Sequence, residues 1–139
     1  MNDNGTKPKP RSAMLLTSAI LVLVLVAAFV HLSLGELIFL LNGLGYLGLA
    51  ALVVIAYNVP HPLVARFAWF PRVALIGYAL TTIVGYLIIG PYSTLGWTTK
   101  VVEVVMITLV VIDLVREYGS ARAVVREAVD SLSGRAYGG

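Results

Sequence analysis

The sequence predicts an all-α, polytopic integral membrane protein: an antiparallel bundle of four transmembrane helices followed by a short C-terminal amphipathic helix. Three observations support this prediction. Of the 139 residues, 59% are hydrophobic and 12% are charged, which is about half the charged fraction of a soluble domain. The apolar residues form stretches long enough for a helix to cross a bilayer core about 30 Å thick. The basic residues lie between these stretches in a pattern that assigns them to one side of a membrane.

The composition also excludes several classes of protein. A chain this apolar is not disordered through its body. It contains no cysteine, which excludes a disulfide framework, thiolate metal sites and cysteine nucleophiles. It has no glycine-rich phosphate loop, no HExxH zinc motif and no GxSxG nucleophile elbow. We therefore expect no enzymatic activity, no cofactor, no metal and no nucleic-acid partner, and we expect the lipid bilayer to be the main partner.

The four spans are expected over residues 12–31, 36–57, 72–90 and 98–118, between a disordered tail at 1–11 and a cytoplasmic amphipathic tail at 119–139. Helix is expected despite the many Val and Ile residues, because in lipid a helix satisfies its backbone hydrogen bonds within its own segment. Pro60 and Pro62 follow the second span, and Gly90 and Pro91 follow the third. The first apolar stretch exceeds the length of a cleavable signal peptide's apolar region, so we expect it to stay as a membrane anchor.

The fourth span is the most polar of the set. It contains Lys100, Glu103 and Asp113, and an acidic residue near the middle of a membrane costs about 2.5–3.5 kcal/mol on insertion scales. The unbroken apolar run 104–112 separates the first two charges from the third. We therefore predict a spanning helix with polar ends; the alternative is an amphipathic helix lying on the membrane surface.

The positive-inside rule orients the predicted helices. Basic residues lie before the first span, between the second and third, and after the fourth, whereas Lys100 alone falls on the opposite side. Both termini are therefore expected in the cytoplasm. The residues on the cytoplasmic side are Lys7, Lys9, Arg11, Arg66, Arg72, Arg116, Arg122, Arg126 and Arg135.

The segment after Gly119 has a different pattern, in which apolar and charged residues occupy opposite faces at helical spacing. It predicts an amphipathic helix that rests on the inner leaflet or docks on a partner. The apolar face comprises Val124, Val125, Ala128, Val129 and Leu132, and the charged face comprises Arg122, Arg126, Glu127 and Asp130.

Small residues are expected to form the faces on which the spans pack, because helices in lipid associate through close van der Waals contact. One row has a spacing of four residues in the third span, and a cluster of glycines lies in the second. Either face could also join the chain to a second copy or to a larger membrane complex. The residues are Gly77, Thr81 and Gly85, and Gly43, Gly45 and Gly48.

Polar side chains inside the spans are candidate functional residues, because they are costly in lipid. The outer candidates are His31, Glu36, Asn42, Tyr46, Lys100 and Glu103. We expect Glu103 to face the bundle and Glu36 to approach Lys100 from the neighbouring helix. Such a network would be a set of structural ion pairs, a proton or ion relay, or a small-ligand site. On the inner side, Asp113, Arg116 and Glu117 lie within reach of one another at helical spacing and are expected to form ion pairs, and Asp113 can also reach Arg66 or Arg72 across the bundle.

Two runs, HLSLGELIFLLNGLGY from His31 to Tyr46 and GPYSTLGWTTKVVE from Gly90 to Glu103, resemble stretches of small four-span bacterial membrane proteins of unknown function. The resemblance covers residues 14–115. It implies the four-helix fold and a bacterial inner membrane, and it implies no activity.

Three functions fit these observations. The first is a non-enzymatic accessory or scaffold subunit of a membrane complex. The second is a small ion or proton channel or carrier that uses Glu36, Lys100 and Glu103, with Asp113 at the inner end. The third is a membrane module that binds a quinone or a pigment. His31 and His61 cannot share one haem, because the predicted topology separates them across the membrane.

Overall fold

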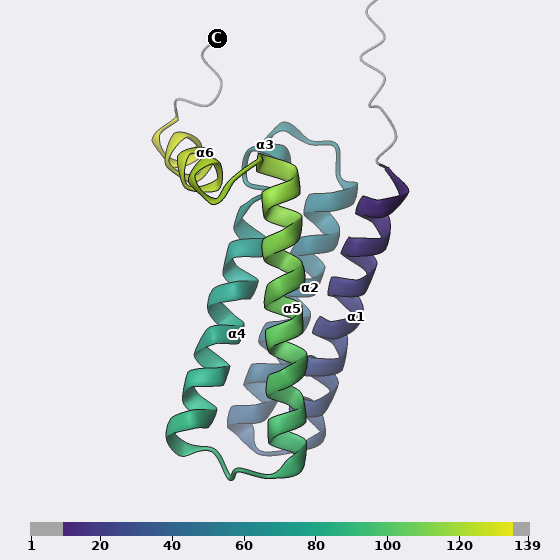
Figure 1. Ribbon diagram of the computed structural model, residues 1–139, viewed down its shortest axis with the longest axis vertical. Helices are drawn as coiled ribbons and strands as arrows, with labels where there is room; N and C mark the ends of the chain where they lie inside the picture. The colour runs from purple at the N-terminus through teal and green to yellow at the C-terminus, as the bar shows by residue number, and fades with distance from the viewer. Residues whose placement is uncertain (1–9, 135–139) are drawn as a thin grey trace, which may run out of the picture.

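The computed structural model describes residues 10–134, and within this range the chain is helical without a β-strand, which confirms the all-α class. Four long helices, α1, α2, α4 and α5, lie side by side, while the short α3 and the amphipathic α6 lie together at one end (Figure 1). Residues 1–9 and 135–139, which include most of the expected N-terminal tail, lie outside the described residues. The helices are α1 Arg11–Ser33, α2 Leu37–Asn58, α3 Pro62–Arg66, α4 Phe70–Ile89, α5 Thr94–Tyr118 and α6 Ala121–Ser133.

Three of the long helices, α1, α2 and α4, are long and apolar enough to cross a membrane. α5, which carries Lys100, Glu103 and Asp113, is not among these three. The outward-facing surface of the three helices is apolar: Phe29 and Ile88, for example, are 72% and 71% exposed. An apolar surface of this extent is typical of helices that face lipid rather than water.

The core lies where the four long helices face each other. α1 packs against α2 and α5, and α4 packs against the other sides of the same two helices. The inward positions include both small residues such as Ala27 and Ala79 and larger ones such as Leu75 and Met106, so the helices pack closely in this part of the bundle. The fully buried apolar side chains include Val24, Ala27, Ala28, Leu75, Ala79, Met106 and Val110.

The glycines of α2 differ in their role. A Cβ atom added at Gly43 would lie 2.6 Å from Cγ of Leu32, and one added at Gly45 would overlap the hydroxyl group of Tyr78. These two glycines therefore let α1 and α4 approach α2 closely. Gly48, by contrast, has open space around its Cα.

The row of small residues on α4 does not pack against another helix of the described chain. Gly77 and Gly85 have open space around them, and Thr81 is exposed, with its hydroxyl donating to the Gly77 carbonyl. The expectation of a packing face within the chain is wrong here, because α4 faces the core with Leu75 and Ala79 instead.

α6 folds back onto the α3–α4 region through Ser131, which is fully buried. Nε of Arg66 donates to the Ser131 carbonyl at 2.8 Å, and Nε1 of Trp69 donates to its hydroxyl at 2.9 Å. Three residues of its apolar face, Val125, Val129 and Leu132, remain exposed along one side of the helix. α6 thus has one face on the protein and an adjacent apolar face without a partner in the described chain.

The described basic residues other than Lys100 belong to one end of the molecule. They lie at the start of α1, in α3, at the start of α4, at the end of α5 and in α6, all of which meet at the end where α6 lies (Figure 1). Lys100 lies in the first turns of α5, near the opposite end.

Candidate functional site

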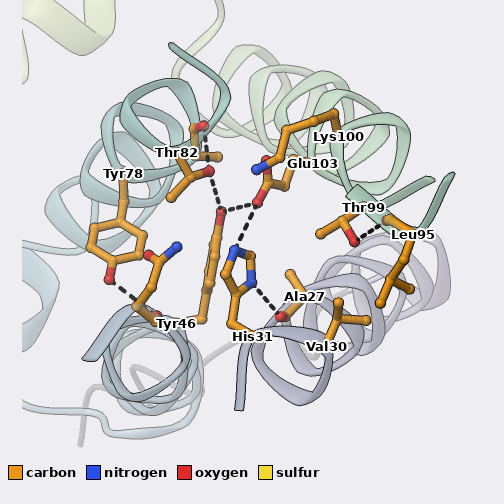
Figure 2. A network of polar contacts seen from close by, with 12 residues as sticks. Ala27, Val30, His31, Tyr46, Tyr78, Thr82, Leu95, Thr99, Lys100 and Glu103 are labelled. Atoms are coloured by element: carbon orange, nitrogen blue, oxygen red, sulfur yellow. Dashed lines mark hydrogen bonds and ion pairs between the residues drawn. The ribbon is translucent and has the colours of Figure 1, made fainter. Parts of the chain in front are cut away.

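A buried carboxylate lies at the centre of the candidate site. Glu103 on α5 is 0% exposed. Its Oε1 accepts a hydrogen bond from the Tyr46 hydroxyl at 2.9 Å, and its Oε2 accepts one from Nζ of Lys100 at 2.5 Å (Figure 2). Nε2 of His31 lies 3.9 Å from Oε1. Side chains of α1, α2 and α5 therefore converge on one carboxylate.

The two charges of the site come from the same face of α5, because residues three apart on a helix are neighbours. Lys100 and Glu103 form an ion pair, and Lys100 is only 7% exposed. The Lys100 ammonium also lies 5.6 Å from the centroid of the Tyr86 ring on α4, within the range of a cation–π contact. The pair is electrically neutral, which is the condition under which two charges are tolerated in apolar surroundings.

Tyr46 connects the carboxylate to α4. Its hydroxyl lies 3.2 Å from Oγ1 of Thr82, and its ring meets the edge of the Tyr78 ring with centroids 5.0 Å apart. The Tyr78 hydroxyl in turn donates to the backbone carbonyl of Asn42 at 3.0 Å. Gly45 makes this approach of Tyr78 to α2 sterically feasible.

The hydrogen-bond partners of His31 define which of its nitrogens carries a proton. Nδ1 lies 2.7 Å from the Ala27 carbonyl, which can only accept, so Nδ1 is the N–H donor. In the neutral imidazole Nε2 then presents a lone pair toward Glu103. A proton on Nε2 would convert this contact into an ion pair.

The structure brings together four of the six predicted outer residues: His31, Tyr46, Lys100 and Glu103. Glu36 is not part of this group, because it is exposed at the N-terminus of α2 and Lys100 has Glu103 as its partner. The predicted approach of Glu36 to Lys100 is therefore absent from the described structure. Asn42 contributes through its backbone carbonyl rather than through its side chain.

Sequence reasoning missed Tyr78 and Thr82, which join the site from α4. Their spacing of four residues puts both on one face of an apolar helix. That pattern was a usable signal, but single Tyr and Thr residues are too common in spans to stand out without knowledge of the facing helix.

A cavity of about 830 Å³ adjoins this group of residues. It lies between the region where α1 connects to α2 and the region where α4 connects to α5. Lys100 and His31 form part of its polar wall, and most of the remaining wall is apolar or aromatic. Its volume lies in the range of sites for small organic molecules. The cavity is also lined by Phe39, Asn42, Tyr78, Thr81, Gly85 and Tyr86.

A second buried ion pair lies near the opposite end of the helices. Nε of Arg72 donates to Oδ2 of Asp113 at 2.6 Å, and Nη1 of Arg72 donates to the Ala68 carbonyl at 2.8 Å. Of the interactions predicted for Asp113, the structure has the ion pair with Arg72 across the bundle. Arg116 and Glu117 are exposed, and Arg116 donates to the Ser12 hydroxyl of α1 instead, because Asp113 is directed toward α4.

The two charged sites are separated by an apolar layer. Glu103 and Asp113 are separated by about 15 Å of helix, from a rise of 1.5 Å per residue. The layer between them includes Val24, Leu75, Met106 and Val110, all fully buried. The described core thus offers no chain of polar side chains from one site to the other.

Comparisons with protein-family models, with curated proteins and with solved structures give no match to this chain. Within residues 10–134 no group of three His, Asp or Glu side chains could hold a metal ion. The chemistry of the site is therefore that of a neutral, buried ion pair beside a largely apolar cavity.

The ion pair predicts how variants of the site affect stability. Lys100→Met leaves the Glu103 carboxylate buried without its counter-charge, so we expect it to lower the free energy of unfolding by about 3–5 kcal/mol. Glu36→Gln changes an exposed side chain and should stay within about 0.5 kcal/mol of the wild type. Thermal unfolding in a mild detergent compares the two; equal melting of Lys100→Met and wild type would contradict the proposed role of the pair.

Proposed function

We propose that the chain is a non-enzymatic integral membrane protein with four spans that binds a small amphipathic molecule in the cavity beside Glu103. The observation that carries the proposal is a cavity of about 830 Å³ with largely apolar walls, lined by the charged side chains of Lys100 and Glu36. A site of this kind holds an apolar body against the walls and orients one polar group. Of the functions considered from the sequence, the quinone- or pigment-binding module is the nearest.

The proposal includes α5 as the fourth span. In its support, the charged residues Lys100, Glu103 and Asp113 are buried and paired inside the group of helices, so none of them needs to face lipid. The opposite side of α5 is apolar, with Val101 62% exposed. Polar residues that face a bundle interior are the form in which spans tolerate charge.

Both termini are proposed to lie in the cytoplasm of a bacterial cell. The charge distribution supports this orientation, because the described basic residues other than Lys100 gather at the end that carries α3 and α6. α6 would then lie along the inner leaflet, with Val125, Val129 and Leu132 on the acyl chains and its arginines near the lipid phosphates. The resemblance to four-span bacterial proteins agrees with this arrangement and stays a prediction.

Single cysteines test the topology, since the native chain has none. Thr94→Cys, at the start of α5, should react with a membrane-impermeant maleimide on intact cells. Ser133→Cys, at the end of α6, should react only after the membrane is opened. Labelling of both positions from the same side would remove α5 as a span, and the reverse pattern would invert the orientation.

A channel or carrier has less support than a binding site. A conducted ion or proton would need polar groups or water through the layer of Val24, Leu75, Met106 and Val110, which is closely packed and apolar. An accessory subunit has one specific observation in its favour. The open row of Gly77, Thr81 and Gly85 on α4 would allow close approach of a helix from another protein.

Filling the cavity tests the proposed binding. A Cβ at Gly85 meets open space, so Gly85→Leu should fold normally while its side chain occupies the cavity. Gly48→Leu is the matched control, because Gly48 also has open space but does not line the cavity. We expect wild type and Gly48→Leu, purified gently from native membranes, to carry the same small molecule, and Gly85→Leu to carry at least about tenfold less. Mass spectrometry of solvent extracts makes the measurement.

Two results would contradict the proposal. The first is an equal amount of every small molecule in Gly85→Leu and wild type. The second is a wild-type protein that carries no molecule above the level found in Gly85→Leu. A protein companion that co-purifies with wild type and Gly48→Leu but is lost from Gly85→Leu, with no small molecule bound to any of the three, would instead favour the accessory subunit.

A further inference from the structure

We infer that the molecule bound in this cavity is neutral and presents a carbonyl oxygen, as a quinone or an enone does, to the ammonium group of Lys100. The inference rests on the proposed function and specifies its ligand class. It follows from the charge balance at the cavity, from the hydrogen-bond donors that its wall leaves available, and from the kinds of side chain that line it.

The charge balance favours a neutral ligand. Lys100 and Glu103 already neutralise each other at 2.5 Å, and both are buried. An anionic ligand would add an uncompensated negative charge to this apolar region, and Glu36 lines the same cavity with a further carboxylate. A cationic ligand beside Lys100 would be repelled by its ammonium, and the Glu36 carboxylate is exposed at the N-terminus of α2 rather than buried beside Lys100. An unpaired buried charge is costly in either case.

The available donors favour an acceptor group on the ligand. Five hydroxyl groups that line the cavity donate to backbone carbonyls: Tyr78 to Asn42, Thr81 to Gly77, Thr82 to Ala79, Tyr86 to Ser93 and Thr99 to Leu95. These bonds direct their hydrogens away from a ligand. The Asn42 amide and the Ser93 hydroxyl are further donors in the wall, and both are neutral. The Lys100 ammonium has three N–H donors, of which Glu103 takes one. Lys100 is therefore the strongest donor that the cavity wall offers.

The shape of the walls favours a planar ring. Phe39, Tyr78 and Tyr86 line the cavity from two sides, and aliphatic side chains cover most of the rest. Aromatic rings pack on one another in offset or edge-to-face contacts that add to the apolar area buried. A conjugated carbonyl compound combines such a ring with the acceptor that Lys100 requires.

The two tryptophans of the chain provide the readout. The Trp97 ring lies 5.4 Å from the Tyr86 ring at the cavity, whereas Trp69 lies at the start of α4, at the opposite end. In the full-length Trp69→Phe protein only Trp97 emits, and in Trp97→Phe only Trp69 emits. Menadione, a neutral naphthoquinone, should quench the fluorescence of Trp97 saturably and that of Trp69 only in proportion to the menadione concentration. The saturable phase of Trp97 quenching should be absent when Gly85→Leu is added.

Competition and a charge-free variant then test the ligand class. Decanoate and decyltrimethylammonium, one anionic and one cationic, should displace menadione at least about tenfold less effectively than neutral 2-decanone. Lys100→Met combined with Glu103→Met removes both charges together, and it should weaken menadione binding at least about tenfold while leaving the helical circular dichroism unchanged.

Each outcome bears on one of the two claims. The inference is overturned if either charged probe displaces menadione more effectively than 2-decanone does. This competition uses the native Lys100 and Glu103, so its result does not depend on whether the double variant folds. Unchanged menadione binding by a folded double variant also overturns the inference. In both cases the Gly85-sensitive quenching would still support the cavity as a binding site. Absence of any saturable, Gly85-sensitive quenching would overturn the proposed function as well.

Discussion

A carboxylate that is removed from water must be paired, and this constraint organises the half of the molecule that contains the α4–α5 connection. Glu103 has no exposed surface, and it receives the Tyr46 hydroxyl and the Lys100 ammonium while His31 lies beside it. Each partner comes from a defined position on its helix, so satisfying one side chain fixes the relative positions of α1, α2 and α5. The contact of Tyr46 with Tyr78 and Thr82 extends the same constraint to α4.

The cavity is a consequence of the same arrangement. Lys100 is held toward Glu103 and Tyr86, so its ammonium forms part of the cavity wall without entering lipid. Most of the wall hydroxyls are engaged with backbone carbonyls, and small residues such as Gly85 leave space where a larger side chain would fill it. At the other end, Arg72 and Asp113 pair in the same way but belong to the end that α6 covers. The apolar layer keeps the two ion pairs independent.

The long helices could be predicted from the sequence, but most contacts between side chains of different helices could not. Long apolar stretches and their bounding prolines and glycines predict α1, α2 and α4 closely, because backbone hydrogen bonding within a span requires only local sequence. The pair of Lys100 and Glu103 was also predictable, because it is local to one helix. Glu36 was misplaced and Tyr78 was missed because both depend on the rotation of one helix against another. The Gly77, Thr81 and Gly85 row has the spacing of a packing face, yet rotation turns it away from the core.

The packing of the helices depends on Glu103 being buried and paired with Lys100. Infrared difference spectroscopy between the wild type and Glu103→Gln, with glutamate isotopically labelled, observes this group directly in lipid. We expect the variant to lose the band of a carboxylate whose frequency is shifted by the hydrogen bonds from Tyr46 and Lys100. This band should respond slowly to deuterated solvent, because the hydrogens on the two buried donors exchange slowly. Loss of a protonated carboxyl band instead, or of a carboxylate band with the frequency and solvent response of a hydrated side chain, would contradict a buried ion pair.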